Sequence, residues 1–159
     1  MWLKIHTVHW VIFDGEIEKV EFPSKVGILC ILPHHNPLVS IVTPWLVKFV
    51  PAEKKGNKTI SNSEFLFDDE KIAIAVGEGS MYTDGKDVVM FVASATVTPK
   101  SDEETLQHMK KDLEEKIRSI RASWNTEDIE KAYLNLQKLT ADIKLLDIKK
   151  HTHKDQNSF

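Results

Sequence analysis

The chain has 159 residues, of which 42% are apolar and 28% are charged, a balance typical of one globular domain or two small ones. Its formal net charge is −3, and no run of Lys and Arg stands clear of acidic residues, so we expect no nucleic-acid partner. The single cysteine, Cys30, excludes an internal disulfide, and its place in an apolar run predicts a buried, reduced thiol.

Two apolar stretches invite a membrane assignment, but neither predicts a spanning helix. Residues 1–13 are interrupted by His6 and His9, and no small-residue cleavage site follows them, which argues against a signal peptide. Residues 26–47 carry no formal charge but contain three prolines, which would leave backbone groups unpaired in lipid. We therefore expect a soluble chain with no direct membrane insertion, which reaches a membrane only through a partner.

Residues 1–97 read as short strands separated by turn residues. About 8 to 10 strands at roughly ten-residue spacing favour an all-β sandwich or barrel of antiparallel strands. Asp14-Gly15 and Asp84-Gly85 are the strongest hairpin signals in this half. The polar stretch 52–59 contains a glycine and predicts an exposed hairpin loop.

Two nearly apolar strands, residues 27–32 and 37–42, flank a histidine pair that is bracketed by prolines. Their two-sided apolar character predicts sheets packed face to face. Pro33 and Pro37 fix φ and remove two N–H donors, so the strand must end and the loop between them is stiff. A stiff loop loses little entropy on binding, so its shape suits docking.

Residues 98–150 change to a helical period. Ser101 and Glu104 form a capping-box pattern, and Asn125 or Thr126 is the expected cap of a second helix. Two narrow stripes predict an antiparallel helical hairpin that buries one stripe against the other: Leu106, Met109, Leu113, Ile117 and Ile120, then Ile129, Ala132, Leu136, Leu139, Ile143 and Leu146. The polar, aperiodic residues 151–159 predict a disordered tail.

The histidines raise the alternative of a metal-dependent enzyme. Neighbouring side chains on an extended chain point opposite ways, so His34 and His35 do not easily reach one ion. His6 and His9 could add ligands, but their spacing gives no support. Because no nucleophile elbow or phosphate-cradling loop appears either, we expect no catalytic residue and no metal. Two alternatives stay open: a small His-based metal-dependent enzyme, and a β-sandwich adaptor with an interaction hairpin.

Three blocks of sequence occur in a fixed order and carry a family resemblance. FDGEIEKVEFP is similar to F-x-G-E-V-x-x-V-x-x-P, through Phe13, Gly15, Glu16, Ile17, Val20 and Pro23. GILCILPHHNPLVS is similar to G-x-x-G-I-L-P-x-H-A-P-L, through Gly27, Ile31, Leu32, Pro33, His35, Pro37 and Leu38. IAVGEGSMYTDGKDVVMFVASA is similar to I-A-V-x-G-G-x-x-x-V, through Ile74, Ala75, Val76, Gly79, Ala93 and Ala95. With the helical hairpin after them, the chain resembles the epsilon subunit of F-type ATP synthases.

This resemblance implies a non-catalytic subunit of the central stalk, peripheral on the cytoplasmic face of the bacterial plasma membrane. The β domain would pack on the gamma subunit and touch the polar loops of the c-ring, coupling proton flow to ATP synthesis. The hairpin would fold down on the β domain or rise towards the alpha and beta subunits, where it restrains ATP hydrolysis. The expected subunit-docking loop comprises Gly27, Leu32, Pro33, His34, His35, Asn36, Pro37 and Leu38.

The resemblance also assigns residues of the hairpin. Arg118 and Arg121 would pair with acidic loops of the beta subunit when the hairpin rises. Some bacterial members bind ATP through an [I/L]-D-x-x-R-A motif, which Asp128 and Ala132 match here, whereas Lys131 replaces the arginine. Lysine lacks the bidentate fork of arginine. We therefore expect no cofactor, with ATP on the hairpin as the alternative.

Overall fold

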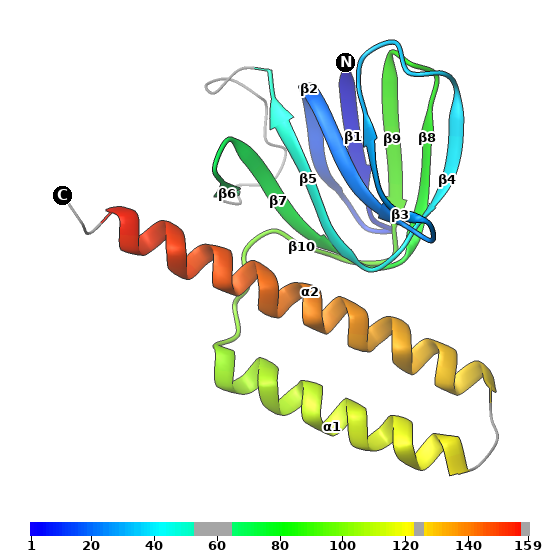
Figure 1. Cartoon of the computed structure of the whole chain (residues 1–159), viewed down its shortest axis with the longest axis vertical. Coiled ribbons are helices and arrows are strands. Elements are labelled where there is room, and N and C mark those ends of the chain that lie inside the picture. The colour runs from blue at the N-terminus through cyan, green and yellow to red at the C-terminus, as the bar shows by residue number, and fades with distance from the viewer. Residues whose placement is uncertain (53–64, 123–125, 157–159) are drawn as a thin grey trace.

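The computed structural model describes residues 1–52, 65–122 and 126–156, which form a β-sandwich and a pair of helices beneath it (Figure 1). The strands are β1 (Trp2–His6), β2 (Val11–Ser24), β3 (Gly27–Ile31), β4 (Leu38–Val42), β5 (Trp45–Pro51), β6 (Leu66–Asp68), β7 (Lys71–Val76), β8 (Gly79–Thr83), β9 (Asp87–Val92) and β10 (Ala95–Thr96). The helices are α1 (Glu103–Ala122) and α2 (Thr126–Gln156). The polar loop expected at residues 52–59 lies outside the described residues from position 53 onwards.

The strands form two sheets that share β2. In sheet A the order is β4-β8-β9-β1-β2, and in sheet B β2 continues to β5, β7 and β10, with β3 on β2 and β6 on β7. The first half of β2 pairs with β1, and its second half pairs with β5 and β3. The expected antiparallel sandwich is confirmed, except that β1 and β9 run parallel.

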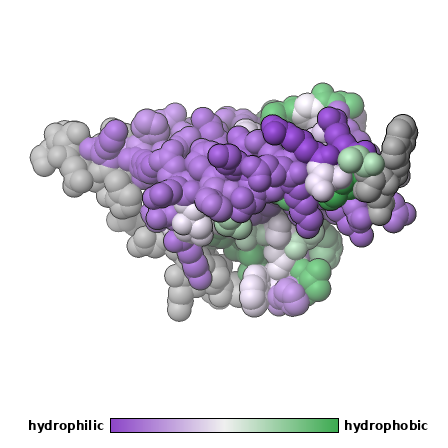
Figure 2. Space-filling model, turned by 90° about the horizontal axis from the view of Figure 1, so that it is seen from below, coloured by the Kyte–Doolittle hydropathy of each residue, from purple (hydrophilic) through white to green (hydrophobic). Residues whose placement is uncertain are grey.

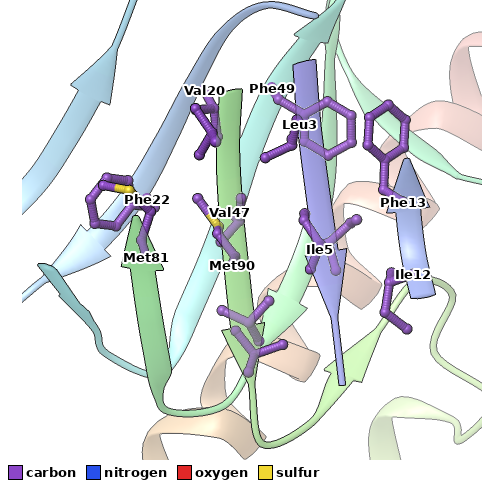
Figure 3. Close-up of a cluster of buried hydrophobic side chains, with 14 of the residues drawn as sticks. Leu3, Ile5, Ile12, Phe13, Val20, Phe22, Val47, Phe49, Met81 and Met90 are labelled. Carbon is purple, nitrogen blue, oxygen red and sulfur yellow. The ribbon is translucent and has the colours of Figure 1, made fainter. Parts of the chain in front are cut away.

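Alternating side chains of both sheets meet in one core (Figure 3). Phe13 of β2 and Phe49 of β5 contact each other with ring centroids 4.4 Å apart, and Met81 and Met90 of sheet A belong to the same core. Each large apolar side chain buried in this way contributes about 1.5–3 kcal/mol to folding. The alternation seen in the sequence therefore fixes which face of each strand points inwards.

One of the two predicted Asp-Gly turns is wrong. Asp14 and Gly15 lie inside β2, where buried Gly15 pairs with Leu3, and the chain instead reverses earlier, between His6 and Val11. Asp84-Gly85 does form the turn between β8 and β9, and Gly85 has a positive φ of 93°.

The helices begin close to the predicted positions, but a different residue caps α1. The carboxylate of Asp102 accepts a hydrogen bond from the N–H of Thr105 at 2.8 Å, so Asp102, and not Ser101, is the N-cap. Hydrogen bonds from the Thr105 side chain first and from its N–H second favour the charged carboxylate, and together they lower the pKa of Asp102. Helix α2 begins at Thr126, next to Asn125, which lies outside the described residues.

Helix α2 extends beyond the predicted hairpin, to Gln156. Residues 151–156, which the sequence assigns to a disordered tail, are helical here. The hydroxyl of Thr152 lies within hydrogen-bonding distance of the carbonyls of Ile148 (3.0 Å) and of Phe67 in β6 (3.2 Å), so contact with the sandwich supports this last part. Among the described residues, no helix is both long and apolar enough to cross a bilayer.

Helix α2 carries two apolar stripes, of which the sequence pattern predicted only one. Leu139, Ile143 and Leu146 pack with Leu106 of α1, as the predicted hairpin requires. The second stripe, Ala141, Leu145 and Ile148, packs on the outer face of sheet B. Met109, which was predicted to lie in the seam between the helices, is instead 49% exposed.

Candidate docking surfaces

The Pro33–Pro37 loop begins with a β-turn whose geometry is defined by one hydrogen bond and one dihedral angle. The N–H of His35 donates to the carbonyl of Leu32 at 3.1 Å, which places Pro33 and His34 at the two central positions. His34 has φ 66°, and a positive φ after proline identifies a type II turn. That position favours glycine or asparagine, so a histidine there carries backbone strain on the order of 1 kcal/mol.

The turn is held against the end of sheet A. The N–H of His34 donates to the carbonyl of Gly85 at 2.8 Å, which ties the loop to the β8–β9 turn. The N–H of Trp2 donates to the carbonyl of Lys86 at 3.1 Å, so the start of β1 lies at the same end. The carboxylate of Asp84 accepts from the N–H groups of Lys86 and Asp87, and these bonds lower the pKa of Asp84.

The structure separates the roles of the two adjacent histidines. The ring of His35 is half-buried, and its Nδ1 lies 2.7 Å from the carbonyl of Asn36, the geometry of a donated N–H bond. The side chain of His34 is exposed. His6 lies at the far end of β1, where its ring stacks on Phe91 with centroids 4.8 Å apart. The four histidines of the enzyme alternative therefore do not converge, and the described residues contain no cluster suited to a metal ion.

Most of the predicted docking loop lies together, but Gly27 does not. Leu32, His34 and Pro37 follow one another at the end of sheet A beside Gly85, and all three are exposed. Gly27 lies at the opposite end of β3, in the turn from β2, where the hydroxyl of Ser24 donates to its carbonyl at 2.7 Å. Gly27 therefore belongs to a different surface.

A second candidate surface is the outer face of sheet A. The sequence pattern predicted that both faces of these strands are packed, but this face is exposed. Cross-strand partners share a face, so the pairs Val39–Tyr82 and Tyr82–Val89 form one row. Ile41, Ser80, Phe91 and His6 form the next row. Val39, Ile41, Tyr82 and Phe91 are 72%, 52%, 49% and 56% exposed, and we call these four residues the sheet A patch. Lys4 and Asp14 form an ion pair at 3.7 Å beside it.

Cys30 lies on the outer side of β3 and is exposed, contrary to the prediction of a buried thiol. Its neighbours Leu29 and Ile31 point towards the core, and Ile28 is 58% exposed. The apolar run 27–32 is therefore one-sided in its packing, because β3 pairs only with β2 among the described strands and no helix covers it.

Helix α2 covers the outer face of sheet B. Ala73 and Ala75 are small, so the helix approaches closely and buries Ala141 and Leu145 completely. Polar contacts surround this cluster: the ammonium of Lys138 donates to the hydroxyl of Thr96 at 2.8 Å and to Asp142 at 2.7 Å. Lys150 pairs with Glu103, which joins the end of α2 to the start of α1. Within the described part of the chain, α2 thus covers one outer face of the sandwich, whereas the other face carries exposed apolar side chains.

The predicted regulatory residues lie around the turn of the helix pair. Arg118 and Arg121 are exposed on α1, and the guanidinium carbon of Arg121 lies 5.8 Å from the ring centroid of Tyr133. Asp128 and Lys131 are exposed in the first turns of α2, whereas Ala132 is 5% exposed. Figure 2 shows a mainly hydrophilic outer surface on the helices, with hydrophobic surface gathered on the sandwich beside them.

Comparison with known proteins agrees with this architecture. Residues 1–79 match the family model for the ATP synthase delta/epsilon chain, beta-sandwich domain. The ATP synthase epsilon chain of Nitratiruptor sp. is 29% identical over 83 residues, which span 52% of this chain and 64% of that one. The epsilon chain of Dichelobacter nodosus is 26% identical over 135 residues, 83% of this chain and 84% of the relative.

A solved structure shares the fold. A chain of the Euglena gracilis mitochondrial ATP synthase, in the OSCP/F1/c-ring assembly, superposes with a TM-score of 0.62 at 16% identity, over 87% of this chain and 76% of that one. At this identity the likeness concerns the fold alone. The fold and the surfaces define a two-part β-sandwich and helical-hairpin protein. Through its β-sandwich the chain belongs to the delta/epsilon family of ATP synthase chains, as its sequence motifs indicated.

Proposed function

We propose that this chain is a non-catalytic central-stalk subunit of a rotary ATP synthase, peripheral at the cytoplasmic face of a bacterial plasma membrane. It couples proton flow through the c-ring to ATP synthesis, and its helical hairpin restrains ATP hydrolysis. The observation that carries this proposal is a difference between the outer faces of the two sheets. Helix α2 covers sheet B, whereas the sheet A patch leaves four large apolar side chains in solvent.

The sheet A patch is the proposed docking site for the gamma subunit. Contiguous exposed apolar surface of this kind is typical of protein interfaces, and two of its four members are aromatic. The patch lies on the strands of a rigid sheet, so little conformational entropy is lost when a partner covers it.

The Pro33–Pro37 loop is the proposed contact with polar loops of the c-ring. It lies at the end of sheet A that is remote from the helices, and its strained turn is fixed before any partner arrives (Figure 1). The exposed imidazole of His34 and the amide of Asn36 supply hydrogen-bonding groups suited to a polar partner.

The hairpin is proposed to restrain hydrolysis by leaving sheet B and rising to the alpha and beta subunits. Arg118 and Arg121 would then pair with acidic loops of the beta subunit. The contact that must open is small, because alanines form half of its buried cluster: Ala73, Ala75 and Ala141. We also propose that no cofactor is required, since Lys131 offers phosphate a point charge in place of a bidentate guanidinium.

Co-purification tests the first part of the proposal. The intact chain, used as bait on detergent-solubilised membranes, should retain a gamma subunit and the c-ring. A double variant, Val39→Ser and Phe91→Ser, should lose the gamma subunit, whereas Val26→Ser, another exposed apolar residue, should retain it. Retention of gamma by the double variant would contradict docking through sheet A.

Deletion of residues 101–159 tests the inhibitory part. The truncated chain should still assemble into the enzyme, and ATP hydrolysis should rise. If the assembled enzyme hydrolyses ATP at an unchanged rate, the hairpin does not restrain it, and the coupling role would stand alone. Equilibrium dialysis of the intact chain with ATP should show no saturable binding at millimolar nucleotide.

A further inference from the structure

The first turn of the sandwich presents apolar side chains that the proposed docking surfaces do not include. Residues Thr7–Trp10 connect β1 to β2 and are here named the Thr7–Trp10 tip. Val8 is 85% exposed and Trp10 is 68% exposed, which makes Trp10 the most exposed aromatic residue among those described. Residues 7–11 carry no formal charge. An uncharged loop with an exposed indole is an unusual solvent surface.

The tip is stiff. The N–H of Thr7 donates to the carbonyl of Trp10 at 2.9 Å, which closes the turn. The hydroxyl of Thr7 accepts from the N–H groups of His9 and Trp10 at 3.4 and 3.3 Å. The rings of His9 and Trp10 lie 5.7 Å apart, which further restricts the indole. A turn held in this way loses little backbone freedom when a partner covers it.

The tip lies at the end of sheet A that is opposite to the Pro33–Pro37 loop. The loop is bonded to Gly85, next to the start of β1, whereas the tip follows His6 at the end of β1. At about 3.4 Å per residue, the four steps from Trp2 to His6 place the two ends of β1 about 14 Å apart. The loop proposed to meet the c-ring and the tip therefore face opposite ways, so the tip points away from the membrane side.

The tip also continues the sheet A patch. His6, the last residue of β1, stacks on Phe91 of the patch, and the tip begins at the next residue. A partner that covers Phe91 thus meets the tip at its border. Tryptophan is enriched among the energetic hot spots of interfaces, where it fills a desolvated pocket of the partner.

We infer that the Thr7–Trp10 tip is an anchor: the side chains of Trp10 and Val8 fill an apolar pocket on the shaft subunit, at the end of the sheet A interface remote from the membrane. This inference rests on the proposed function, because it assigns the tip to the same partner as the sheet A patch.

The test measures the affinity of purified gamma subunit for the intact chain and for single variants. Trp10→Ala should weaken binding by about tenfold or more, as for other buried tryptophan anchors, and Trp10→Phe should restore most of it. Val8→Thr should weaken binding measurably. The matched control is Val26→Thr, because Val26 is also 85% exposed but lies in the turn between β2 and β3. It should bind like the unchanged chain, and all variants should unfold at the same temperature.

Other outcomes overturn the inference. Equal binding of Trp10→Ala and the unchanged chain means that no pocket receives the indole. If the unchanged chain self-associates in sedimentation and Trp10→Ala does not, the tip serves a second copy instead. If it binds vesicles of anionic phospholipid through Trp10, the tip serves a membrane. Failure of the unchanged chain to bind gamma at all, by contrast, contradicts the proposed function itself.

Discussion

The N–H of His34 donates to the carbonyl of Gly85 across 2.8 Å, and this bond holds a histidine where a type II turn favours glycine. The strain is retained because the loop is tied to sheet A at that point. A substitution at position 34 should therefore relieve the backbone strain and leave the loop in place.

His34→Gly should stabilise the chain by up to about 1 kcal/mol, since glycine adopts a positive φ without steric cost, although it also gains freedom in the unfolded state. Urea denaturation at neutral pH gives the free energy of unfolding. Asparagine also tolerates a positive φ, so the free energy of unfolding of His34→Asn should lie between those of the unchanged chain and His34→Gly. A clear loss of stability in His34→Gly would show that the imidazole makes a stabilising contact.

Gly85→Ala should destabilise the chain more than Gly27→Ala. Both glycines have a positive φ, 93° and 118°, so both substitutions strain the backbone. A Cβ at Gly85 would lie 2.5 Å from the carbonyl oxygen of His35, whereas one at Gly27 meets nothing within 4 Å. The difference between the two unfolding free energies isolates the clash with the Pro33–Pro37 loop, and equal values would mean that the loop moves aside freely.

Leu145→Ala should cost about 2–5 kcal/mol, because Leu145 is fully buried between α2 and sheet B. Leu136→Ala, on the same helix but only half-buried, is the control and should cost about 1 kcal/mol. Far-UV circular dichroism during urea denaturation reports both. Similar costs at the two positions would argue that α2 does not pack on the sandwich in solution.

His6 should make the stability of the chain depend on pH. Burial first and the charge of Lys4 second lower its pKa in the folded state, against the opposing effect of Asp14. The unfolded chain then binds more protons, so His6 destabilises the fold as the pH falls below about 6.5. Relative to His6→Gln, the unchanged chain should lose stability between pH 7.5 and 5.5. The other histidines are common to both proteins, so parallel profiles would contradict the shift at His6.

The sequence pattern predicted an element well where only one of its faces is buried, against a single core. Alternation in β7 put Ile72 and Ile74 into the core, as observed. The same alternation left Ala73 and Ala75 on the other face, but it could not show that a helix lies there. The second stripe of α2 carries the signal, since Ala141, Leu145 and Ile148 recur at steps of three and four, yet the first stripe seemed to account for the whole helix.

Most of the remaining errors have one physical origin. Periodicity counts apolar residues but does not show what covers them, so exposed Ile28, Val39 and Ile41 read as core. Cys30 was assigned to the interior for the same reason. The Asp14-Gly15 signal failed differently: Gly15 pairs with Leu3 inside β2, so tertiary pairing overrode a local turn preference. The chain reverses instead at the Thr7–Trp10 tip, which contains no glycine and therefore gives no turn signal in the sequence.

Because β2 runs without interruption through both sheets, the two layers of the sandwich share a covalent strand of 14 residues. Layers joined only by side-chain packing can slide past each other under a sideways load. Here such shear would also have to bend β2 where it passes from one sheet to the other. A force applied to one layer therefore reaches the other through the main chain of β2 as well as through side-chain packing in the core.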